Sequence, residues 1–345
     1  MQSIVHFRGP IEFRLRSMAV VSQSIVEVGI RRAQKGPHRP GWNWFMELGT
    51  EILKRQVRTA FEMHDVERAR LHLDSFLFGP AEIPDVTITH LKEKEFRGSW
   101  FLPKTASDLT TMLYFHGGGY SFYPQAYANF VALLARITNT RIFALDYRLT
   151  PQHRFPAQLK DAVRAYRWLL NHQSDGSDLI VAGDSAGGNL TLALLLAARD
   201  ESLPMPALAI ALSPPTDFES DRLQINDLNS DWIDKPMLEQ WADWFCDLDQ
   251  RRNPLVSPWV ADLRGLPPIY LQAGRAEILY DSIQAFADRA RGRGADVVLE
   301  SWEDMNHDFQ LFGPYVWQSR EALQRVREII DARVRKPADS RTVAN

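Results

Sequence analysis

The sequence predicts an α/β protein in which a mainly parallel, eight-stranded sheet is flanked by helices and carries a helical cap. Short β-rich runs recur from about residue 84 onward, and helical patterns separate them from the third run on. Strands that alternate with helices build parallel sheets through crossover connections. The eight expected strands are 86–91, 96–102, 110–115, 141–146, 178–183, 207–212, 267–274 and 295–302.

Two parts of the chain do not fit this alternation. Residues 1–83 show helical spacing of apolar side chains, for example between Trp44 and Val57. More than fifty residues separate the strands at 207–212 and 267–274, where a crossover needs about a dozen or more. We therefore expect an N-terminal helical part of the cap, and a core over 84–345 with a cap insertion at about 215–260.

Composition excludes several classes of function. The 345 residues carry 40 basic and 43 acidic side chains, so the net charge of −3 gives no field that would attract nucleic acid. Charges interrupt the N-terminal segment, and no stretch reaches the ~18 apolar residues of a membrane span, so we expect no stable membrane insertion and a cytoplasmic protein. The single cysteine, Cys246, excludes a CxxC pair, and HExxH is absent, so no metal or cofactor is expected.

The stretch GDSAG places Ser185 between a β-rich run and an apolar helix. This is the context of a nucleophile elbow, where flanking glycines let strand and helix approach closely. Asp184 precedes the serine as part of the same motif. The backbone N–H of Ala186, at the start of the helix, would face developing negative charge.

A second glycine-rich stretch, HGGGY, follows the expected strand at 110–115. Such a turn could also hold a phosphate, but no P-loop or GxGxxG pattern accompanies it. Its position upstream of the elbow is where esterases and lipases place an oxyanion loop. Gly118 and Gly119 then become donors to the oxyanion, with His116 and Gly117 supporting the loop.

A serine nucleophile needs an acid and a histidine base, and with an elbow of this kind the acid and then the histidine follow the serine along the chain. His307 is the one histidine after Ser185, and it lies just beyond the strand at 295–302. Glu277 is three residues past the strand end at Gly274, whereas Asp281 comes one helical turn later. We favour Glu277 as the acid and keep Asp281 as the alternative.

The chain resembles the hormone-sensitive-lipase-like family of α/β-hydrolases, in its microbial esterase branch. The resemblance covers about 84–320 and rests on HGGGY, DYRLTPQHRFPAQLKDA, GDSAGGN, SPPTDF, NPLVSPWVADLRGLPPIYLQAG, AEILYD and NHDFQLF. It implies the α/β-hydrolase fold, Ser185 and His307 as nucleophile and base, and Gly118, Gly119 and Ala186 as oxyanion donors. Two positions depart from the family pattern: Glu277 where an Asp is frequent, and Asp308 where many members have glycine.

The leading hypothesis is a cofactor-free serine carboxylesterase that acts on small, short- to medium-chain esters through an acyl-enzyme. Hydrolysis of a lactone, carbamate or amide by the same residues stays open, as does a catalytically silent ligand-binding relative. Trp241, Trp244 and Phe245 are candidate acyl-pocket residues, although with Trp232 they could form the exposed lid of an interfacial lipase. A homodimer is also left open.

Overall fold

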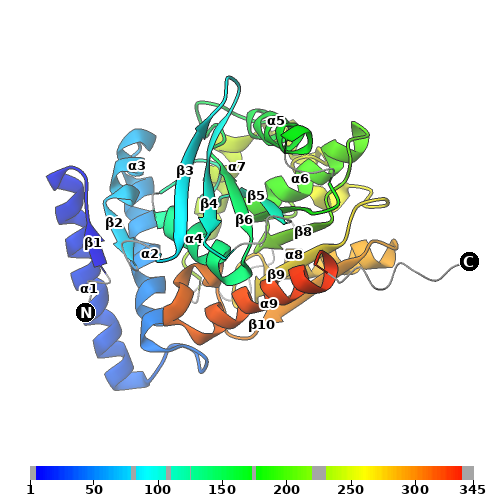
Figure 1. The fold of residues 1–345 in the computed structure, drawn as a ribbon. Coiled ribbons are helices and arrows are strands. Elements are labelled where there is room, and N and C mark those ends of the chain that lie inside the picture. The colour runs from blue at the N-terminus through cyan, green and yellow to red at the C-terminus, as the bar shows by residue number, and fades with distance from the viewer. Residues whose placement is uncertain are drawn as a thin grey trace, which may run out of the picture.

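An eight-stranded sheet runs through the centre of the molecule (Figure 1). The computed structural model describes residues 5–78, 83–105, 110–124, 126–172, 176–219 and 231–335. The strand order is β10-β9-β8-β7-β5-β6-β4-β3, with parallel pairing from β10 to β6 and antiparallel pairing of β6 with β4 and of β4 with β3. The strands are β3 (Val86–Lys92), β4 (Arg97–Pro103), β5 (Thr111–Phe115), β6 (Arg141–Leu145), β7 (Leu179–Asp184), β8 (Leu208–Leu212), β9 (Ile269–Gly274) and β10 (Val297–Trp302).

The burial of the strands follows from their position in the sheet. Every residue of β5, β7, β8 and β9 is buried, as expected for parallel strands that are covered on both faces. The edge strand β3 is largely exposed. All eight predicted strands are present and the predicted fold class is confirmed. A small antiparallel pair, β1 (Val5–Phe7) with β2 (Phe76–Phe78), was not predicted, because three-residue strands carry little periodicity.

Helices cover both faces of the sheet. A buried cluster under α4 and α9 fills one side, and clusters beneath α5, α6 and α8 fill the other. The parallel strands end along one buried edge of the sheet, and the loops that follow these strands meet there. These helices are α4 (Ala126–Thr138), α5 (Ala157–His172), α6 (Ala186–Asp200), α8 (Tyr280–Gly292) and α9 (Trp317–Arg333), and a 3₁₀ segment, η4, spans Phe309–Tyr315.

The N-terminal segment forms α1 (Ile11–Lys35), α2 (Trp44–Glu62) and α3 (Val66–Asp74), which lie together at one side of the sheet in Figure 1. The fully buried carboxylate of Glu47 on α2 pairs with Arg31 at 2.9 Å and with Arg32, which fixes α1 against α2. Trp42 donates its indole N–H to the carbonyl of Asp304 at 2.6 Å. The N-terminal helices are thereby tied to the loop that carries His307.

The predicted insertion contains α7 (Lys235–Phe245), with Asp234 as N-cap and Pro236 in the first turn, as its sequence indicates. Residues 220–230 of the expected insertion lie outside the described residues. Within the described part of the chain, no helix combines the length and the apolar character that crossing a membrane requires.

Candidate active site

Ser185 occupies a sharp turn between β7 and α6. Its φ of 48° lies in the left-handed region that residues other than glycine rarely adopt, and its N–H donates to the carbonyl of Leu212 at 2.8 Å. A side chain at Gly187 would overlap the carbonyl of Phe115, and one at Gly183 would overlap the backbone of Gly187. The flanking glycines therefore allow strand and helix to approach, as the motif predicted.

His307 reaches Ser185 from the loop that follows β10. The Nε2 atom lies 2.9 Å from the Ser185 Oγ, and the side chain is 1% exposed. Trp232 donates its indole N–H to the His307 carbonyl at 2.7 Å, which holds the loop. Burial lowers the pKa of His307 to about 3, so the imidazole is neutral at pH 7 and can accept a proton.

Glu277 faces the other nitrogen of His307. Its Oε2 lies 3.9 Å from Nδ1, which is ion-pair range but longer than a hydrogen bond. Burial raises the pKa of the Glu277 carboxyl, whereas hydrogen bonds from the Ser213 hydroxyl at 2.6 Å and the Gly274 N–H at 3.3 Å oppose this. Catalytic hydrogen bonds often shorten only when substrate binds. Asp281, the alternative, lies in the first turn of α8.

The HGGGY loop follows β5 and lies beside Ser185 in the lining of the same cavity. Gly118 and Gly119 have φ values of 97° and 60°, which glycine adopts without strain. A side chain at Gly119 would overlap the indole of Trp241. Gly118 and Gly119 line the same cavity as Ser185, and Ala186 lines a smaller adjoining one with Ser185 and Gly119.

His116 and Asp184 hold this loop from below. The His116 ring is stacked between Tyr123 and Tyr147, with centroids 3.6 and 4.1 Å away, and its Nδ1 lies 2.7 Å from the Gly117 carbonyl. The Asp184 carboxylate accepts the Gly117 N–H at 3.0 Å and two tyrosine hydroxyls. Both residues are buried, which fits the supporting role that the sequence predicted.

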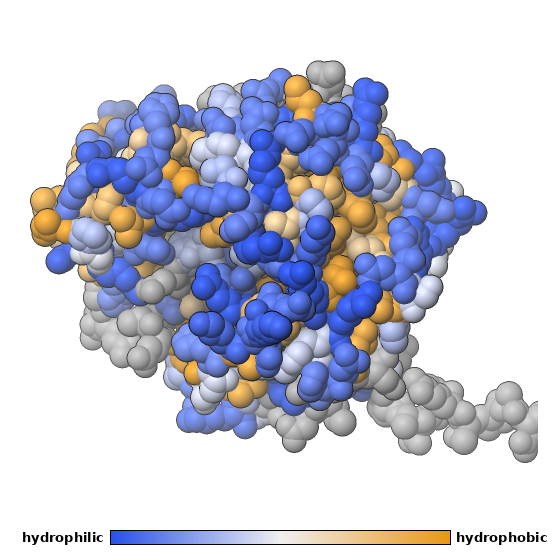
Figure 2. Space-filling model, turned by 90° about the horizontal axis from the view of Figure 1, so that it is seen from above, coloured by the Kyte–Doolittle hydropathy of each residue, from blue (hydrophilic) through white to orange (hydrophobic). Residues whose placement is uncertain are grey.

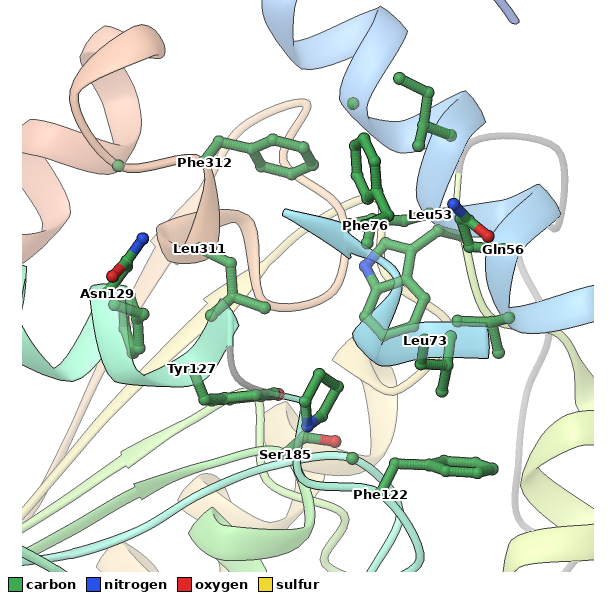
Figure 3. Close-up of a pocket in the computed structure, with 18 of the residues that line it drawn as sticks. Leu53, Gln56, Leu73, Phe76, Phe122, Tyr127, Asn129, Ser185, Leu311 and Phe312 are labelled. Carbon is green, nitrogen blue, oxygen red and sulfur yellow. The ribbon is translucent and has the colours of Figure 1, made fainter. Parts of the chain in front are cut away.

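A cavity of about 190 Å³ lies above Ser185 (Figure 3). Its floor is Ser185, His307, Gly118 and Gly119, and its walls are mostly apolar. Leu53 and Gln56 come from α2, whereas Leu311 and Phe312 approach from the opposite side. The other apolar wall residues include Val57, Leu73, Phe76, Phe122, Trp232 and Trp241.

The three aromatic residues proposed for an acyl pocket have different positions. Trp241 lines the cavity, whereas Trp244 stacks on Phe61, with ring centroids 5.6 Å apart, and Phe245 stacks on Tyr120 at 4.0 Å. Trp244 and Phe245 are not among the lining residues of either cavity. Trp241 and Phe245 are buried, as is Trp232, so these rings do not form an exposed apolar lid.

Sequence reasoning did not identify two polar residues that hold the site. Ser213 follows β8 and bridges the Glu277 carboxylate and the Asp308 N–H, the latter at 3.3 Å. Asp231, whose buried carboxylate accepts the N–H groups of Ile278 at 2.8 Å and His307 at 3.3 Å, joins the two loops. Ser213 could have been identified from the sequence, because it lies directly after a predicted strand. No local sequence pattern distinguishes Asp231.

Comparisons with known proteins match this chain to alpha/beta hydrolases, among them esterases. A family model described as alpha/beta hydrolase fold matches residues 112–311. An acetyl-hydrolase of Streptomyces hygroscopicus is 33% identical over 287 residues, covering 81% of this chain and 93% of that protein. The crystal structure of a mutant of the esterase E40 has a TM-score of 0.78 at 31% identity, over 85% of this chain and all of that one. A hormone-sensitive lipase from a metagenome library has a TM-score of 0.72 at 31% identity, over 82% and 98%.

Proposed function

Because the chain belongs to the hormone-sensitive-lipase-like family of α/β-hydrolases and is a carboxylic ester hydrolase, we propose that it cleaves short- to medium-chain esters through Ser185, His307 and Glu277. The observation that carries this proposal is the 2.9 Å contact between the Ser185 Oγ and the His307 Nε2 on the floor of an apolar cavity. A nucleophile within hydrogen-bond reach of a buried base is the geometry that acyl transfer requires.

The proposed reaction has two halves. His307 takes the Ser185 proton as Oγ attacks the ester carbonyl, and the N–H groups of Gly118, Gly119 and Ala186 stabilise the oxyanion. His307 then gives its proton to the departing alkoxide, which leaves as the alcohol. Water repeats the sequence on the acyl-enzyme and releases the acid. Glu277 orients His307 and stabilises the imidazolium formed at each step.

The shape of the cavity supports the substrate range. We propose that the N-terminal helices over 1–83 and the insertion at about 215–260 act as a cap, because Leu53, Val57 and Trp241 line the cavity that contains Ser185. An apolar cavity of about 190 Å³ suits a short or medium acyl chain better than a bulky lipid. The acetyl-hydrolase relative fits this range.

The test is a chain-length series. We would measure kcat/KM on p-nitrophenyl esters from acetyl to palmitoyl, with the Ser185→Ala protein as the blank. A maximum at short to medium chains that is absent in the blank is the expected result. Activity that persists in the blank would contradict the assignment of Ser185. Lactone, carbamate and amide substrates belong in the same panel, because the same residues can attack their carbonyl groups.

We also propose that two copies of the chain pair through α1. Its outer face exposes Ile11, Leu15, Met18 and Ile25, which follow the three- and four-residue spacing of helices that pack side by side. The view in Figure 2 is mainly hydrophilic, with separate hydrophobic groups that include one at the end where the N-terminal helices lie. Sedimentation velocity should show a dimer that Leu15→Glu converts to a monomer, and a monomeric wild-type protein would contradict the proposal.

A further inference from the structure

Asp308 is a buried carboxyl group that the proposed reaction does not use. It follows His307 directly, is 1% exposed, and has a φ of 49°. This backbone region is costly for a residue other than glycine and persists only when surrounding contacts maintain it. The contacts of Asp308 therefore need an explanation.

The carboxyl group of Asp308 lies beside the base. Its Oδ2 is 3.3 Å from the His307 Nε2, which is ion-pair range without hydrogen-bond geometry, and the same Nε2 faces the Ser185 Oγ at 2.9 Å. Its backbone N–H donates to Ser213, whose hydroxyl donates to Glu277. Asp308 is thus connected to both sides of the imidazole.

The Asp308 carboxyl also lies beside the Asp184 carboxyl, and a proton on either group would form a hydrogen bond between them. The Asp184 carboxylate in turn accepts the Gly117 N–H at 3.0 Å and the hydroxyls of Tyr114 and Tyr127. Two carboxyl groups can form a hydrogen bond only when one of them keeps a proton. One proton shared by the two groups would therefore link the histidine loop to Asp184, which holds the oxyanion loop through the Gly117 N–H.

The groups that face Asp308 favour its protonated form. Besides Asp184 on β7, these are Glu277 after β9 and Asp231 before α7, together with the phenols on β5 and α4 and the His307 imidazole. Burial and the three acidic neighbours raise the pKa of Asp308. The shared proton is therefore favoured on Asp308, whose Oδ2 lies 3.3 Å from the His307 Nε2.

We propose that Asp308 is a positioning residue for ester hydrolysis, which holds the Nε2 side of His307 while its single proton, shared with Asp184, keeps the histidine and oxyanion loops together. This inference rests on the proposed function of Ser185 and His307. When Ser185 transfers its proton to Nε2, the neutral Asp308 offers a second acceptor for the new N–H. No bond other than these hydrogen bonds changes at Asp308.

Loss of the proton shared by Asp308 and Asp184 would leave two adjacent carboxylates. These groups repel each other, so the link between the histidine and oxyanion loops breaks. An anionic Asp308 also binds the protonated form of His307 and competes with Ser185 for Nε2. The rate should therefore fall at alkaline pH, although a neutral histidine alone would keep it constant there.

The test is the pH dependence of kcat/KM between pH 6 and 10 on p-nitrophenyl butyrate, with the Ser185→Ala rate subtracted. Asp308→Asn keeps a donor toward Asp184 and an acceptor toward Nε2 but has no proton to lose. We expect it to stay within about threefold of the wild type at pH 7 and to move the alkaline fall upward by at least about one pH unit. Asp288→Asn, an exposed change on α8, is the matched control and should leave the profile unchanged.

A second readout separates this role from folding and turnover. The rate at which a fluorophosphonate labels Ser185 reports attack by the serine alone, so it should show the same alkaline fall in the wild type and the same upward shift in Asp308→Asn. Asp308→Ala removes both contacts and should lower kcat about tenfold with KM nearly constant. Melting temperatures confirm that each variant is folded.

Two results would overturn the inference: a wild-type rate that stays constant to pH 10, or an Asp308→Asn profile that superimposes on the wild type. Failure of the proposed function would look different, because the wild type would then hydrolyse no ester or Ser185→Ala would remain active.

Discussion

The floor and the roof of the cavity above Ser185 are built on different principles. The floor consists of loops at the ends of parallel strands, where hydrogen bonds hold Ser185 and His307, and the backbone of Gly119 packs closely against the Trp241 indole. The roof comes from α2, α3, β2 and α7, which contribute mostly apolar side chains (Figure 3). The floor places polar atoms within hydrogen-bond distance of one another, whereas the roof supplies shape.

The floor and the roof should therefore control two different properties, the reaction rate and the choice of substrate. Acyl transfer depends on the placement of a few polar atoms, so changes in the floor should reduce the rate for every ester. Apolar contacts along an acyl chain distinguish substrates by modest free energies. Changes in the roof should therefore alter which ester is preferred more than how fast the best one reacts.

The largest effect is expected from Ser185→Ala. Removing the nucleophile from such a triad lowers kcat by roughly 10⁴- to 10⁶-fold, and the loss should be equal for all chain lengths. The measurement is kcat on acetyl and decanoyl p-nitrophenyl esters, together with a burst of p-nitrophenol at high enzyme concentration. A variant that lost activity on only one ester would show that the floor also selects the substrate.

Glu277→Gln should have the next largest effect. The amide cannot stabilise the imidazolium, so we expect kcat to fall about 10³-fold with little change in KM. Asp281→Asn is the matched control, since it makes the same chemical change one helical turn away, and it should retain more than about half of the activity. The reverse ranking would reassign the acid to Asp281.

The floor was largely predictable from sequence and the roof was not. The strand-turn-helix motif around Ser185 and the glycines of the HGGG stretch are local, and parallel strands bring their loops to one edge whatever the helices do. Helical spacing predicted α2, but spacing does not say which neighbours a helix face meets. The contact of Asp231 with the His307 loop and the orientation of Asp308 depend on packing between distant segments, which no local pattern encodes.

A change in the roof should shift the chain-length preference. Leu53→Phe narrows the cavity from α2, so kcat/KM on the decanoyl ester should fall about tenfold while the acetyl ester changes less than about twofold. Leu71→Phe, the same change at an exposed position of α3, should affect neither ester. Equal losses on both esters would mean that Leu53 supports the floor rather than the roof.

The smallest effect concerns the stability of the roof at mildly acidic pH. His72 on α3 is fully buried, and neither ring nitrogen has a hydrogen-bond partner among the described residues. Burial, and secondarily the charge of Arg16, lowers its pKa to about 4. The unfolded chain, with a histidine pKa near about 6.5, binds this proton first as the pH falls, so the folded state loses stability below that value.

Between pH 7 and pH 5 this single group should cost about 1–2 kcal/mol of unfolding free energy. His72→Leu cannot titrate, so the difference between its unfolding free energies at pH 7 and pH 5 should be smaller than the wild-type difference by that amount. Urea unfolding at both values measures it, with the exposed His90→Leu as the control. If His72→Leu and the wild type lose the same stability, the acid sensitivity lies instead among the buried groups of the floor, and the separation of the two regions would need revision.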